Sequence, residues 1–360
     1  MKNIVHIIDN LTLGGAETLL FSTIKKMSCF EHHIILLDPK IHIKDINNYA
    51  KIYCLNHTGW HSLISSCRKL QKLVATINPV IVHSHLFLSS FITRLALGKK
   101  YKIFYSIHTI YSAAIFKKWY LVLLEKYVYK KEHTLIAVSN YALHDYKQTI
   151  TQCTNGNVLY NFIDNSFFLP ATSSDKQKNQ SLKKWVAVGS LKAVKNYETM
   201  ISLFQRYYEA SDEKEGIVLD IYGQGHLQNV LQDQINQASL PVRLMGKVDS
   251  IHEVLDKYDA YFSTSLYEGY GIAPMEAMSR GLPIFLSNIP VYNEVYSGYA
   301  FFLDVNKKES NSLLEAIEKH QAMSDDQKKT LAQKSKEYSI KVANGDQYIQ
   351  RLMEIYDIKQ

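Results

Sequence analysis

Short runs of apolar and β-branched residues alternate along this chain with longer stretches in which apolar residues recur every three or four positions. The short runs are typical of buried strands, and the longer stretches are typical of amphipathic helices. Strands are predicted in the first half over residues 4–9, 34–38, 52–55, 80–85, 103–108, 135–139 and 158–161. Helices are predicted over residues 16–27, 62–77, 116–131 and 142–149. This alternation predicts a parallel sheet wrapped by helices.

The pattern stops at a polar segment, residues 170–184, and then starts again. Further strands are predicted over residues 185–189, 218–223, 242–246, 260–265 and 283–287, with a helix over residues 196–208. We therefore expect an α/β protein with two doubly wound, Rossmann-like domains and a central cleft, where ligands bind at the carboxyl ends of strands. The expected parts are an N-terminal domain at 1–168, a linker at 169–184, a C-terminal domain at 185–340, and a C-terminal helix at 341–360 that packs back on the first domain.

Composition agrees with a globular protein of this kind, because 360 residues suit two domains of roughly 150 to 200 residues each. Residues 1–165 hold 19 Lys and Arg against 9 Asp and Glu, and the remainder holds 22 against 25. A basic first half indicates an anionic partner, which is a phosphate-bearing substrate, an acidic membrane surface or nucleic acid. The four cysteines lack metal-ligand spacing, and no leader or membrane span is evident, so we expect a cytoplasmic protein with free thiols.

The strongest chemical signal is a pair of carboxylates, Glu268 and Glu276, on either side of a glycine-containing turn that follows a predicted strand. Pro274 fits the first position of a helix, which places Glu276 in its first turn. The N–H groups around Gly271 and Ile272 have no helical partners there, so they can bind a phosphate. Glu276 can then accept hydrogen bonds from the hydroxyls of a ribose, and Glu268 can meet sugar hydroxyls. The alternative is a glycine-rich turn with a favourable acid near the helix start.

Other strand ends carry residues that suit the same ligand. Gly14 and Gly15 follow the first strand and open a helix, where backbone N–H groups approach a phosphate. Lys195 follows the first strand of the second half and can neutralise a diphosphate. Four further residues lie at strand ends of the second half: Ser190, Gly223, Gly225 and Met245. A dinucleotide fingerprint is excluded, because the position that requires its third glycine is Gln228.

Histidines end two strands of the first half. His108 can donate to a substrate oxygen or phosphate, although a lone histidine at a strand end is more often structural. We expect His83 and His85 to face opposite sides of their strand, and therefore not to share a metal ion. No Asp-x-Asp pair, nucleophile elbow or P-loop motif is present in the sequence, so neither a metal nor another cofactor is expected.

Taken together, these motifs resemble those of retaining glycosyltransferases of the GT-B fold, in the large family 4-like bacterial group. The most specific element is Glu-x7-Glu in Glu268-Gly-Tyr-Gly-Ile-Ala-Pro-Met-Glu276. The supporting elements, in the expected order, are Gly14-Gly15-Ala16-Glu17, Val82-His-Ser-His85, Ser106-Ile-His108, Ala137-Val-Ser139-Asn140, Tyr160-Asn161-Phe-Ile-Asp164, Val188-Gly189 through Lys195-Asn196, and Tyr222-Gly-Gln-Gly225.

The resemblance implies a role for each matched position. Gly15 would approach the donor diphosphate from the acceptor-side first domain, and Lys195 would grip it from the nucleotide-sugar-binding second domain. Glu276 would hold the ribose, Glu268 would contact the transferred sugar, and His108 would lie beside the sugar and the acceptor. The phosphate turn would consist of Tyr270, Gly271 and Ile272. The family pattern usually has Arg where this chain has Ser190, Gly where it has Phe162, and Phe where it has Tyr270.

The implied activity is transfer of a hexosyl or N-acetylhexosaminyl group from a nucleoside-diphosphate sugar, with a UDP-sugar favoured, to a glycan acceptor. Residues 115–131 contain five lysines and one glutamate among aromatic and aliphatic residues. Such a stretch can rest on anionic lipid at the inner face of the cytoplasmic membrane, or its apolar face can pack on its own sheet. The membrane alternative favours a polyprenyl-linked acceptor in surface polysaccharide synthesis, such as lipopolysaccharide or capsule. A nucleotide-sugar epimerase, a phosphorylase and a non-catalytic nucleotide-sugar-binding homologue stay open, whereas nucleic acid is not expected as a partner.

Overall fold

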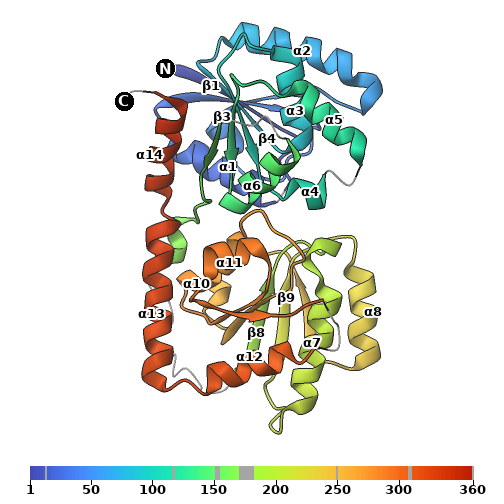
Figure 1. Cartoon of the computed structure of the whole chain (residues 1–360), viewed down its shortest axis with the longest axis vertical. Coiled ribbons are helices and arrows are strands. Elements are labelled where there is room, and N and C mark those ends of the chain that lie inside the picture. Colours follow the sequence, from blue (N-terminus) through green and yellow to red (C-terminus); the bar gives the residue numbers. More distant parts are fainter. Residues whose placement is uncertain are drawn as a thin grey trace. The chain divides into compact units, whose positions relative to one another are not determined.

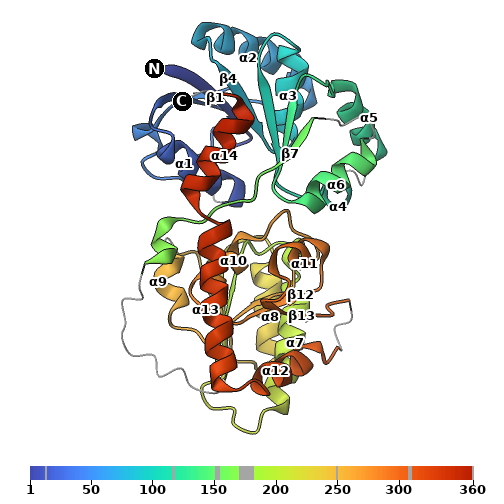
Figure 2. The same cartoon turned by 60° about the vertical axis from the view of Figure 1, so that its left-hand side comes forward.

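The computed structural model of the chain describes residues 1–12, 14–115, 118–150, 155–169, 182–248, 250–306 and 310–358. Two compact units are present (Figures 1 and 2): unit 1 comprises Met1–Phe162 and Gly345–Gln360, and unit 2 comprises Ile163–Asn344. Each contains one parallel sheet with helices packed on it. The predicted fold class, two doubly wound α/β domains, is therefore confirmed. Most of the predicted linker at 169–184 lies outside the described residues.

The sheet of unit 1 has the strand order β3-β2-β1-β4-β5-β6-β7. Its strands are β1 (Lys2–Ile8), β2 (Phe30–Leu36), β3 (Ala50–Cys54), β4 (Ile81–His85), β5 (Ile103–Ile107), β6 (Thr134–Ala137) and β7 (Gly156–Val158). The chain order reverses between the neighbouring strands β1 and β4, which makes a topological switch point there. The loops that follow these two strands are the ones best placed to hold a ligand.

Helices cover both faces of this sheet. They are α1 (Gly15–Lys26), α2 (Leu63–Ile77), α3 (Phe87–Leu97), α4 (Tyr111–Ala114), α5 (Trp119–Val128), α6 (Asn140–Thr149) and α14 (Gly345–Tyr356), with 3-10 turns at Ile46–Asn48 and Trp60–Ser62. Val5 and Ile7 pack with α2 and α3 on one face, whereas Ile4 and Ile8 pack with α14 and α1 on the other.

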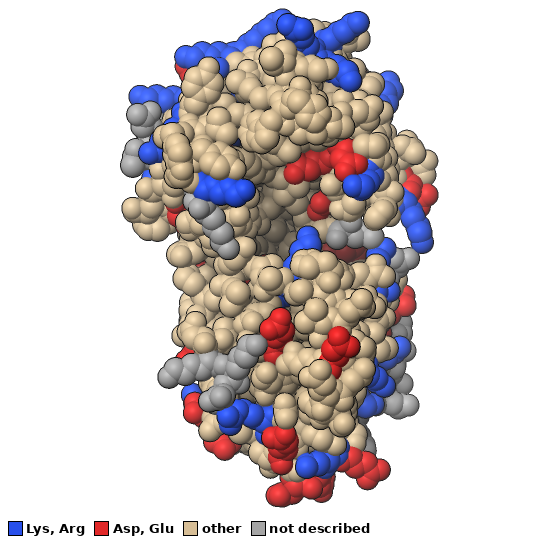
Figure 3. Space-filling model, turned by 90° about the vertical axis from the view of Figure 1, so that its right-hand side faces the viewer, with Lys and Arg blue, Asp and Glu red and all other residues tan. Residues whose placement is uncertain are grey.

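In the face drawn in Figure 3, Lys and Arg side chains gather along the upper end of unit 1.

The sheet of unit 2 has the strand order β10-β9-β8-β11-β12-β13. Its strands are β8 (Lys184–Val188), β9 (Val218–Tyr222), β10 (Val242–Gly246), β11 (Ala260–Ser263), β12 (Ile284–Ser287) and β13 (Ala300–Leu303). Its helices are α7 (Tyr197–Ala210), α8 (Gln228–Ala238), α9 (Ile251–Leu255), α10 (Ile272–Ser279), α11 (Pro290–Tyr296), α12 (Ser312–Gln321) and α13 (Asp325–Val342), with 3-10 turns at Asn165–Phe168 and Ala193–Lys195. The switch point of this sheet lies between β8 and β11.

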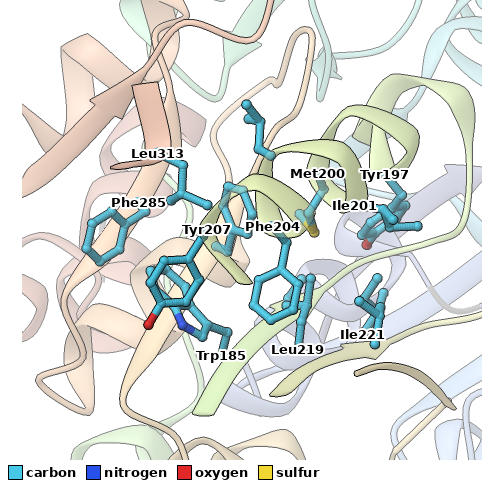
Figure 4. Close-up of a cluster of buried hydrophobic side chains, with 14 of the residues drawn as sticks. Trp185, Tyr197, Met200, Ile201, Phe204, Tyr207, Leu219, Ile221, Phe285 and Leu313 are labelled. Atoms are coloured by element: carbon cyan, nitrogen blue, oxygen red, sulfur yellow. The ribbon is translucent and has the colours of Figure 1, made fainter. Parts of the chain in front are cut away.

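Aromatic side chains fill the core of unit 2 where α7 packs on the sheet. Figure 4 shows Phe204 and Tyr207 of α7 against Trp185 of β8 and Leu219 of β9. The Trp185 ring is fully buried, and its Nε1 donates to the carbonyl of Leu182 at 2.9 Å. Because buried aromatic rings contribute large apolar areas, this packing holds α7 on strands β8 and β9. The loop that carries Lys195 connects β8 to α7.

The observed elements differ from the predicted ones at a few places. Strand β13 was not predicted from the sequence. Strand β7 ends at Val158, where the predicted strand began. Unit 2 begins at Ile163. Arg280 donates to the carbonyls of Phe167 and Leu169 and so holds that segment on unit 2.

Candidate functional site

In unit 2, a cation and a carboxylate meet at the switch point of the sheet. Lys195 ends the loop that follows β8, and Glu268 lies in the loop that follows β11. Lys195 Nζ lies 2.6 Å from Glu268 Oε1, and Ser265 Oγ donates to the same oxygen at 2.8 Å. Both charged side chains are mostly buried, with exposed fractions of 23% and 15%. The pair therefore has a fixed position at the strand ends where a ligand of this fold class binds.

The two loops are also joined through their backbones. Thr264 Oγ1 donates to the carbonyls of Lys195 and Asn196, at 3.1 and 3.0 Å. The N–H of Leu266 donates to the carbonyl of Val194 at 2.8 Å. Because the loops are bonded to each other at several points, the positions of the ammonium and the carboxylate are preorganised before any ligand binds.

The turn before α10 requires glycine at its last residue. Gly271 has a φ of 85°, which is the left-handed region, and a Cβ atom there would overlap the ring of Tyr292. The Tyr292 hydroxyl is bonded to Ser263 Oγ at 3.0 Å, so the ring has no freedom to move away. Tyr296 lies in α11, as Tyr292 does, and its hydroxyl donates to the carbonyl of Gly271. The first N–H groups of α10 are consequently presented in one fixed direction.

The predicted start of this helix was wrong by two residues. Helix α10 begins at Ile272, so Pro274 occupies its third position and Glu276 lies in its second turn. Proline is still compatible with the helix, because N–H groups in the first turn lack intrahelical partners. Glu276 is half-buried, and burial raises the pKa of its carboxyl group to about 7. This carboxyl group therefore ionises near neutral pH.

The glycines after β9 have a structural reason to be small. A Cβ atom on Gly223 would overlap the carbonyl of Gly189, and one on Gly225 would overlap the carbonyl of Leu191. The loop after β9 thus packs directly on the loop after β8, and Leu191 N–H donates to the carbonyl of Gln224 at 3.0 Å. Close packing explains both glycines without a ligand.

The remaining candidates of unit 2 differ in what they can offer a ligand. Met245 is exposed at the end of β10, and Ser190 is half-buried beside Gly189. The side chain of Tyr270 is 2% exposed, so only its backbone can line the turn. Lys192, which is exposed in the same loop as Ser190, is the cation nearest in sequence to the position of the missing arginine.

In unit 1, Gly14 and Gly15 mark the start of α1, at the end of the loop that follows β1. The carboxylate of Glu17 folds back over this helix start, so that a Cβ atom on Gly14 would overlap it. A carboxylate is favourable at a helix N-terminus because of the unpaired N–H groups and the helix dipole. Glu17 therefore occupies part of the space that a phosphate at Gly14 and Gly15 would use.

His108 directly follows β5 and is half-buried. Neither of its ring nitrogens has a hydrogen-bond partner among the described residues. Burial lowers the pKa of His108 to about 4, so the ring is neutral at pH 7 and carries one N–H donor and one acceptor. His108, Gly14 and Gly15 belong to unit 1, whereas the other candidates belong to unit 2.

The prediction that His83 and His85 face opposite sides of their strand was wrong. Side chains two positions apart on a strand share a face. In β4 the two rings lie side by side, with ring centroids 4.1 Å apart and an interplanar angle of 37°. His6 of β1 joins them on the same face, with its ring centroid 5.8 Å from that of His85.

Sequence reasoning missed the residues that hold the charged groups in place. Ser265 orients Glu268, Thr264 ties down the Lys195 loop, and Tyr292 and Tyr296 shape the Gly271 turn. A signal was present, because Ser263, Thr264 and Ser265 form a polar run that begins at the last residue of β11. The two tyrosines gave no signal, since their contacts depend on how α11 packs.

Replacing Gly271 with alanine is expected to destabilise unit 2 more than the same change at Gly298. Both glycines have a φ of 85°, but a Cβ atom on Gly298 meets nothing within 4 Å. The left-handed backbone should cost about 1–2 kcal/mol at either position. Overlap with Tyr292 should add about 1–3 kcal/mol at Gly271 only. Denaturant unfolding of both variants measures the difference, and equal losses would contradict the described turn.

The two doubly wound parallel sheets, each with ligand-compatible loops at its switch point, define the GT-B class of folds. Comparison with known families agrees. Residues 13–167 match the family described as Glycosyltransferase Family 4, and residues 170–340 match the family described as Glycosyl transferases group 1. The two matches together cover most of the chain, which belongs to the GT-B-fold glycosyltransferases and is an enzyme of that type.

Individual relatives are distant. The putative glycosyltransferase EpsF of Bacillus subtilis is 24% identical over 308 residues, which cover 80% of this chain and 79% of EpsF. The O-antigen chain mannosyltransferase RfbU of Salmonella typhimurium is 28% identical over 176 residues, which cover 47% of this chain and 45% of RfbU. The crystal structure of Anabaena HepE in complex with UDP and glucose has a TM-score of 0.82 at 16% identity, and the match covers 99% of this chain and 100% of that one.

Proposed function

We propose that the enzyme transfers a sugar from a nucleoside-diphosphate sugar, with a UDP-sugar favoured, and that the anomeric configuration is retained. The observation that carries the proposal is the Lys195–Glu268 pair beside the Gly271 turn, at the switch point of unit 2. Similar proteins add support, since the HepE structure contains UDP and glucose and RfbU is named a mannosyltransferase. The sugar proposed here is a hexose or an N-acetylhexosamine.

Each candidate residue then has a proposed role at the donor. Lys195 binds the diphosphate together with the first N–H groups of α10. In unit 1, the N–H groups at Gly15 can bind a phosphate only when the Glu17 carboxylate moves off the start of α1. Glu276 accepts hydrogen bonds from the ribose hydroxyls. Glu268 contacts the transferred sugar. The exposed side chain of Met245 contacts the nucleoside, and the loops at Ser190, Gly223 and Gly225 form the backbone wall of the site.

The proposed chemistry follows from where charge develops. When the bond between the sugar and the diphosphate breaks, negative charge builds on the leaving phosphate, and preorganised cations and N–H donors there stabilise the transition state. The acceptor hydroxyl attacks from the face that the diphosphate leaves, and the diphosphate takes its proton. No protein nucleophile is required for this route. His108, which is neutral, is proposed to donate a hydrogen bond to a substrate oxygen.

Donor affinity is expected to rise with pH up to about 7 and then to level off. The carboxyl group of Glu276 ionises at about pH 7, and its ionised form accepts two hydroxyl hydrogen bonds more strongly than its neutral form. Below pH 7, donor binding must supply the free energy that ionises Glu276. The dissociation constant of the donor should therefore increase by up to about tenfold for each unit by which the pH falls. Calorimetric titration with UDP-glucose from pH 5.5 to 8.5 measures this, because its diphosphate does not titrate in that range.

The Glu276→Gln variant is the matched control, since it keeps the size of the side chain and removes its titration. Its donor affinity should be independent of pH and should lie about 1.5–3 kcal/mol below that of the wild type at pH 8. In the absence of donor, the folded unit binds a proton at Glu276 more tightly than the unfolded chain does. This adds to the free energy of unfolding at pH values below the ordinary pKa of a carboxyl group, and the contribution is lost as the pH rises through about 7. A wild-type affinity that does not change with pH would contradict the ribose role.

The acceptor is proposed to be a glycan on a lipid carrier, as in surface polysaccharide synthesis. Helix α5 supports this choice. Its inner face packs on unit 1 through Leu124 and Val128, but Trp119, Leu123 and Tyr127 form a stripe on its outer face with exposed fractions of 74%, 55% and 76%. The inner face agrees with the alternative in which the helix packs on its own sheet, and the outer face is proposed to contact a membrane. Among the described residues, no helix is long and apolar enough to span a bilayer.

The exposed stripe of α5 is proposed to enter the headgroup region of an anionic membrane. Aromatic side chains suit that region, and lysines close to an anionic surface contribute about 1 kcal/mol each. Lys118 and Lys126 are exposed on the same helix segment. We expect Trp119→Ser combined with Tyr127→Ser to reduce binding to phosphatidylglycerol vesicles by about tenfold or more in flotation assays. Val230→Ser, at an exposed apolar position of α8, is the control and should leave binding unchanged. Wild-type protein that fails to float would contradict the membrane contact.

Product analysis tests the proposed reaction against its alternatives. The enzyme is incubated with a UDP-sugar, with and without a polyprenyl-diphosphate-linked sugar, and the products are followed by proton NMR. Transfer predicts a new glycosidic signal with the anomeric configuration of the donor. An epimerase would instead convert the donor sugar without an acceptor. Binding of donor without any conversion would favour a non-catalytic homologue, for which the presence of Ser190 in place of arginine is the motivating observation.

A further inference from the structure

Three histidines of unit 1 lie together on the sheet face that α1 and α14 cover. His6 of β1 is in register with His83 of the neighbouring strand β4, and His85 follows two positions later on the same face. Each of the three residues offers a ring nitrogen, and these nitrogens all lie within 4.8 Å of one another. The exposed fractions of the three residues are 0%, 3% and 5%. The donor residues of unit 2 take no part in this cluster.

Hydrogen bonds determine which nitrogen of His6 carries its proton. His32 Nε2 lies 2.9 Å from the carbonyl of Met27, which only accepts, so Nε2 of His32 is the protonated nitrogen. In neutral His32 the Nδ1 atom is then an acceptor, and His6 Nε2 donates to it at 3.1 Å. A metal-binding imidazole is neutral, and the neutral forms of His6 and His32 satisfy both of these contacts. Nδ1 of His6 is therefore left with a free lone pair and has no partner among the described residues.

The other two rings can also present a lone pair. Both nitrogens of His85 lack hydrogen-bond partners in the described part of the chain, although the ring is buried. His83 contacts the Tyr356 hydroxyl through Nδ1 at 2.7 Å and the Ser106 hydroxyl through Nε2 at 2.8 Å. Because a hydroxyl can donate or accept, His83 can release one of these contacts and keep the other. Buried polar atoms without partners are unfavourable, so a ligand that satisfies several of them at once would be stabilising.

We propose that His6, His83 and His85 bind one divalent transition-metal ion, with Zn²⁺ as the favoured ion, at a structural site inside unit 1. Neutral imidazole suits zinc, copper and nickel, whereas magnesium and calcium require oxygen ligands. Two hydrogen bonds in series link the Met27 carbonyl to His32 and His32 to His6. Hydrogen bonds of this kind orient histidines that bind a metal ion. Zinc–nitrogen bonds of about 2.0–2.1 Å require the three rings to move closer together on binding. The site differs from the expectation of no metal, and it does not depend on the proposed transferase reaction.

Metal content of the full chain tests the site directly. Wild-type protein without an affinity tag is stripped with chelator, mixed with equimolar Zn²⁺, passed through gel filtration and analysed for metal. One ion per chain and a higher unfolding temperature are expected, since a ligand that binds the folded state stabilises it. With Co²⁺ in place of Zn²⁺, we expect visible absorption bands of an ion bound by the three imidazole nitrogens and one water molecule. No retained zinc together with no cobalt bands would overturn the proposal.

Two variants separate this site from adventitious binding. His85→Ala removes a ligand that has no hydrogen bond to lose, so we expect a folded protein that retains no zinc. His32→Phe removes the partner of His6 and should weaken zinc binding by about 10- to 100-fold. His226→Ala, at an exposed histidine of unit 2, is the control and should keep one ion. If His85→Ala retains as much zinc as the wild type, the ion lies elsewhere and the proposal is overturned. Should His85→Ala fail to fold, the cobalt spectrum of His32→Phe decides, and an unchanged affinity contradicts the site.

Discussion

Replacing Lys195 with alanine is expected to reduce turnover by a factor of about 10² to 10³, the loss typical of removing one preorganised group that stabilises developing charge. The Lys195 ammonium is held 2.6 Å from Glu268, and its backbone is fixed by Thr264, so it needs little reorganisation when the diphosphate departs. Release of nucleoside diphosphate at saturating donor measures the effect as a change in kcat.

Lys214→Ala is the control for this variant, because Lys214 is an exposed lysine of the same unit and lies outside the loops of the site. It should change kcat by less than about threefold, as expected for an exposed charge that the solvent screens. The double variant Lys195→Ala, Glu268→Gln tests whether an unpaired Glu268 causes the loss. Turnover that the second change restores, or near-normal turnover in Lys195→Ala alone, would contradict the role of Lys195 at the diphosphate.

Replacing Arg94 with methionine is expected to destabilise unit 1 by about 3–5 kcal/mol, the usual cost of leaving a buried charge without its partner. Arg94 of α3 makes two hydrogen bonds to Glu125 of α5, at 2.7 and 2.8 Å, and neither side chain is exposed to solvent. The Tyr146 hydroxyl also donates to Glu125. For a unit of this size the loss corresponds to a fall in Tm of about 6–20 °C, which differential scanning calorimetry would detect.

Two further variants show whether the buried pair itself is responsible. Lys99→Ala breaks an exposed pair with Glu132 and should lower the Tm far less than Arg94→Met does, because solvent screens exposed ion pairs. Arg94→Met combined with Glu125→Leu removes both charges and should recover much of the loss, because apolar replacements of buried pairs are often neutral or stabilising. A double variant as unstable as the single one would show that packing, not charge, explains the effect. Because this pair anchors α5, its loss should also weaken vesicle binding.

Most of the fold could be predicted from the sequence because β-branched runs and helical periodicity are local signals. The parallel sheets, the doubly wound arrangement and the loop that carries Glu268 all follow from such runs. The start of α10 could not be predicted, since it depends on the left-handed Gly271 and on the Tyr296 hydroxyl, 25 residues further along the chain. Local rules favoured Pro274 as the first helical residue, and tertiary contacts from α11 overrode that preference.

The sequence analysis named the charged residues of the candidate site but did not predict how they are arranged. Lys195 and Glu268 stood out at strand ends, but their ion pair joins positions 73 residues apart, so no sequence window contains it. The histidine cluster of unit 1 was missed for a different reason. The strand that carries His83 and His85 was predicted correctly, and the error lay in the face assigned to side chains two positions apart. His6 could be added only once β1 and β4 were known to be neighbours.

The central claim is that unit 2 binds a nucleoside-diphosphate sugar through Lys195, the Gly271 turn and Glu276. Thermal unfolding with a panel of UDP-, GDP- and ADP-sugars tests it most directly. At a donor concentration 100 times the Kd, binding should stabilise the protein by about 2.7 kcal/mol and raise its Tm by several degrees. We predict this shift with a UDP-sugar for the wild type and a much smaller one for Glu276→Ala. An unchanged Tm with every nucleotide sugar at millimolar concentration would contradict the account.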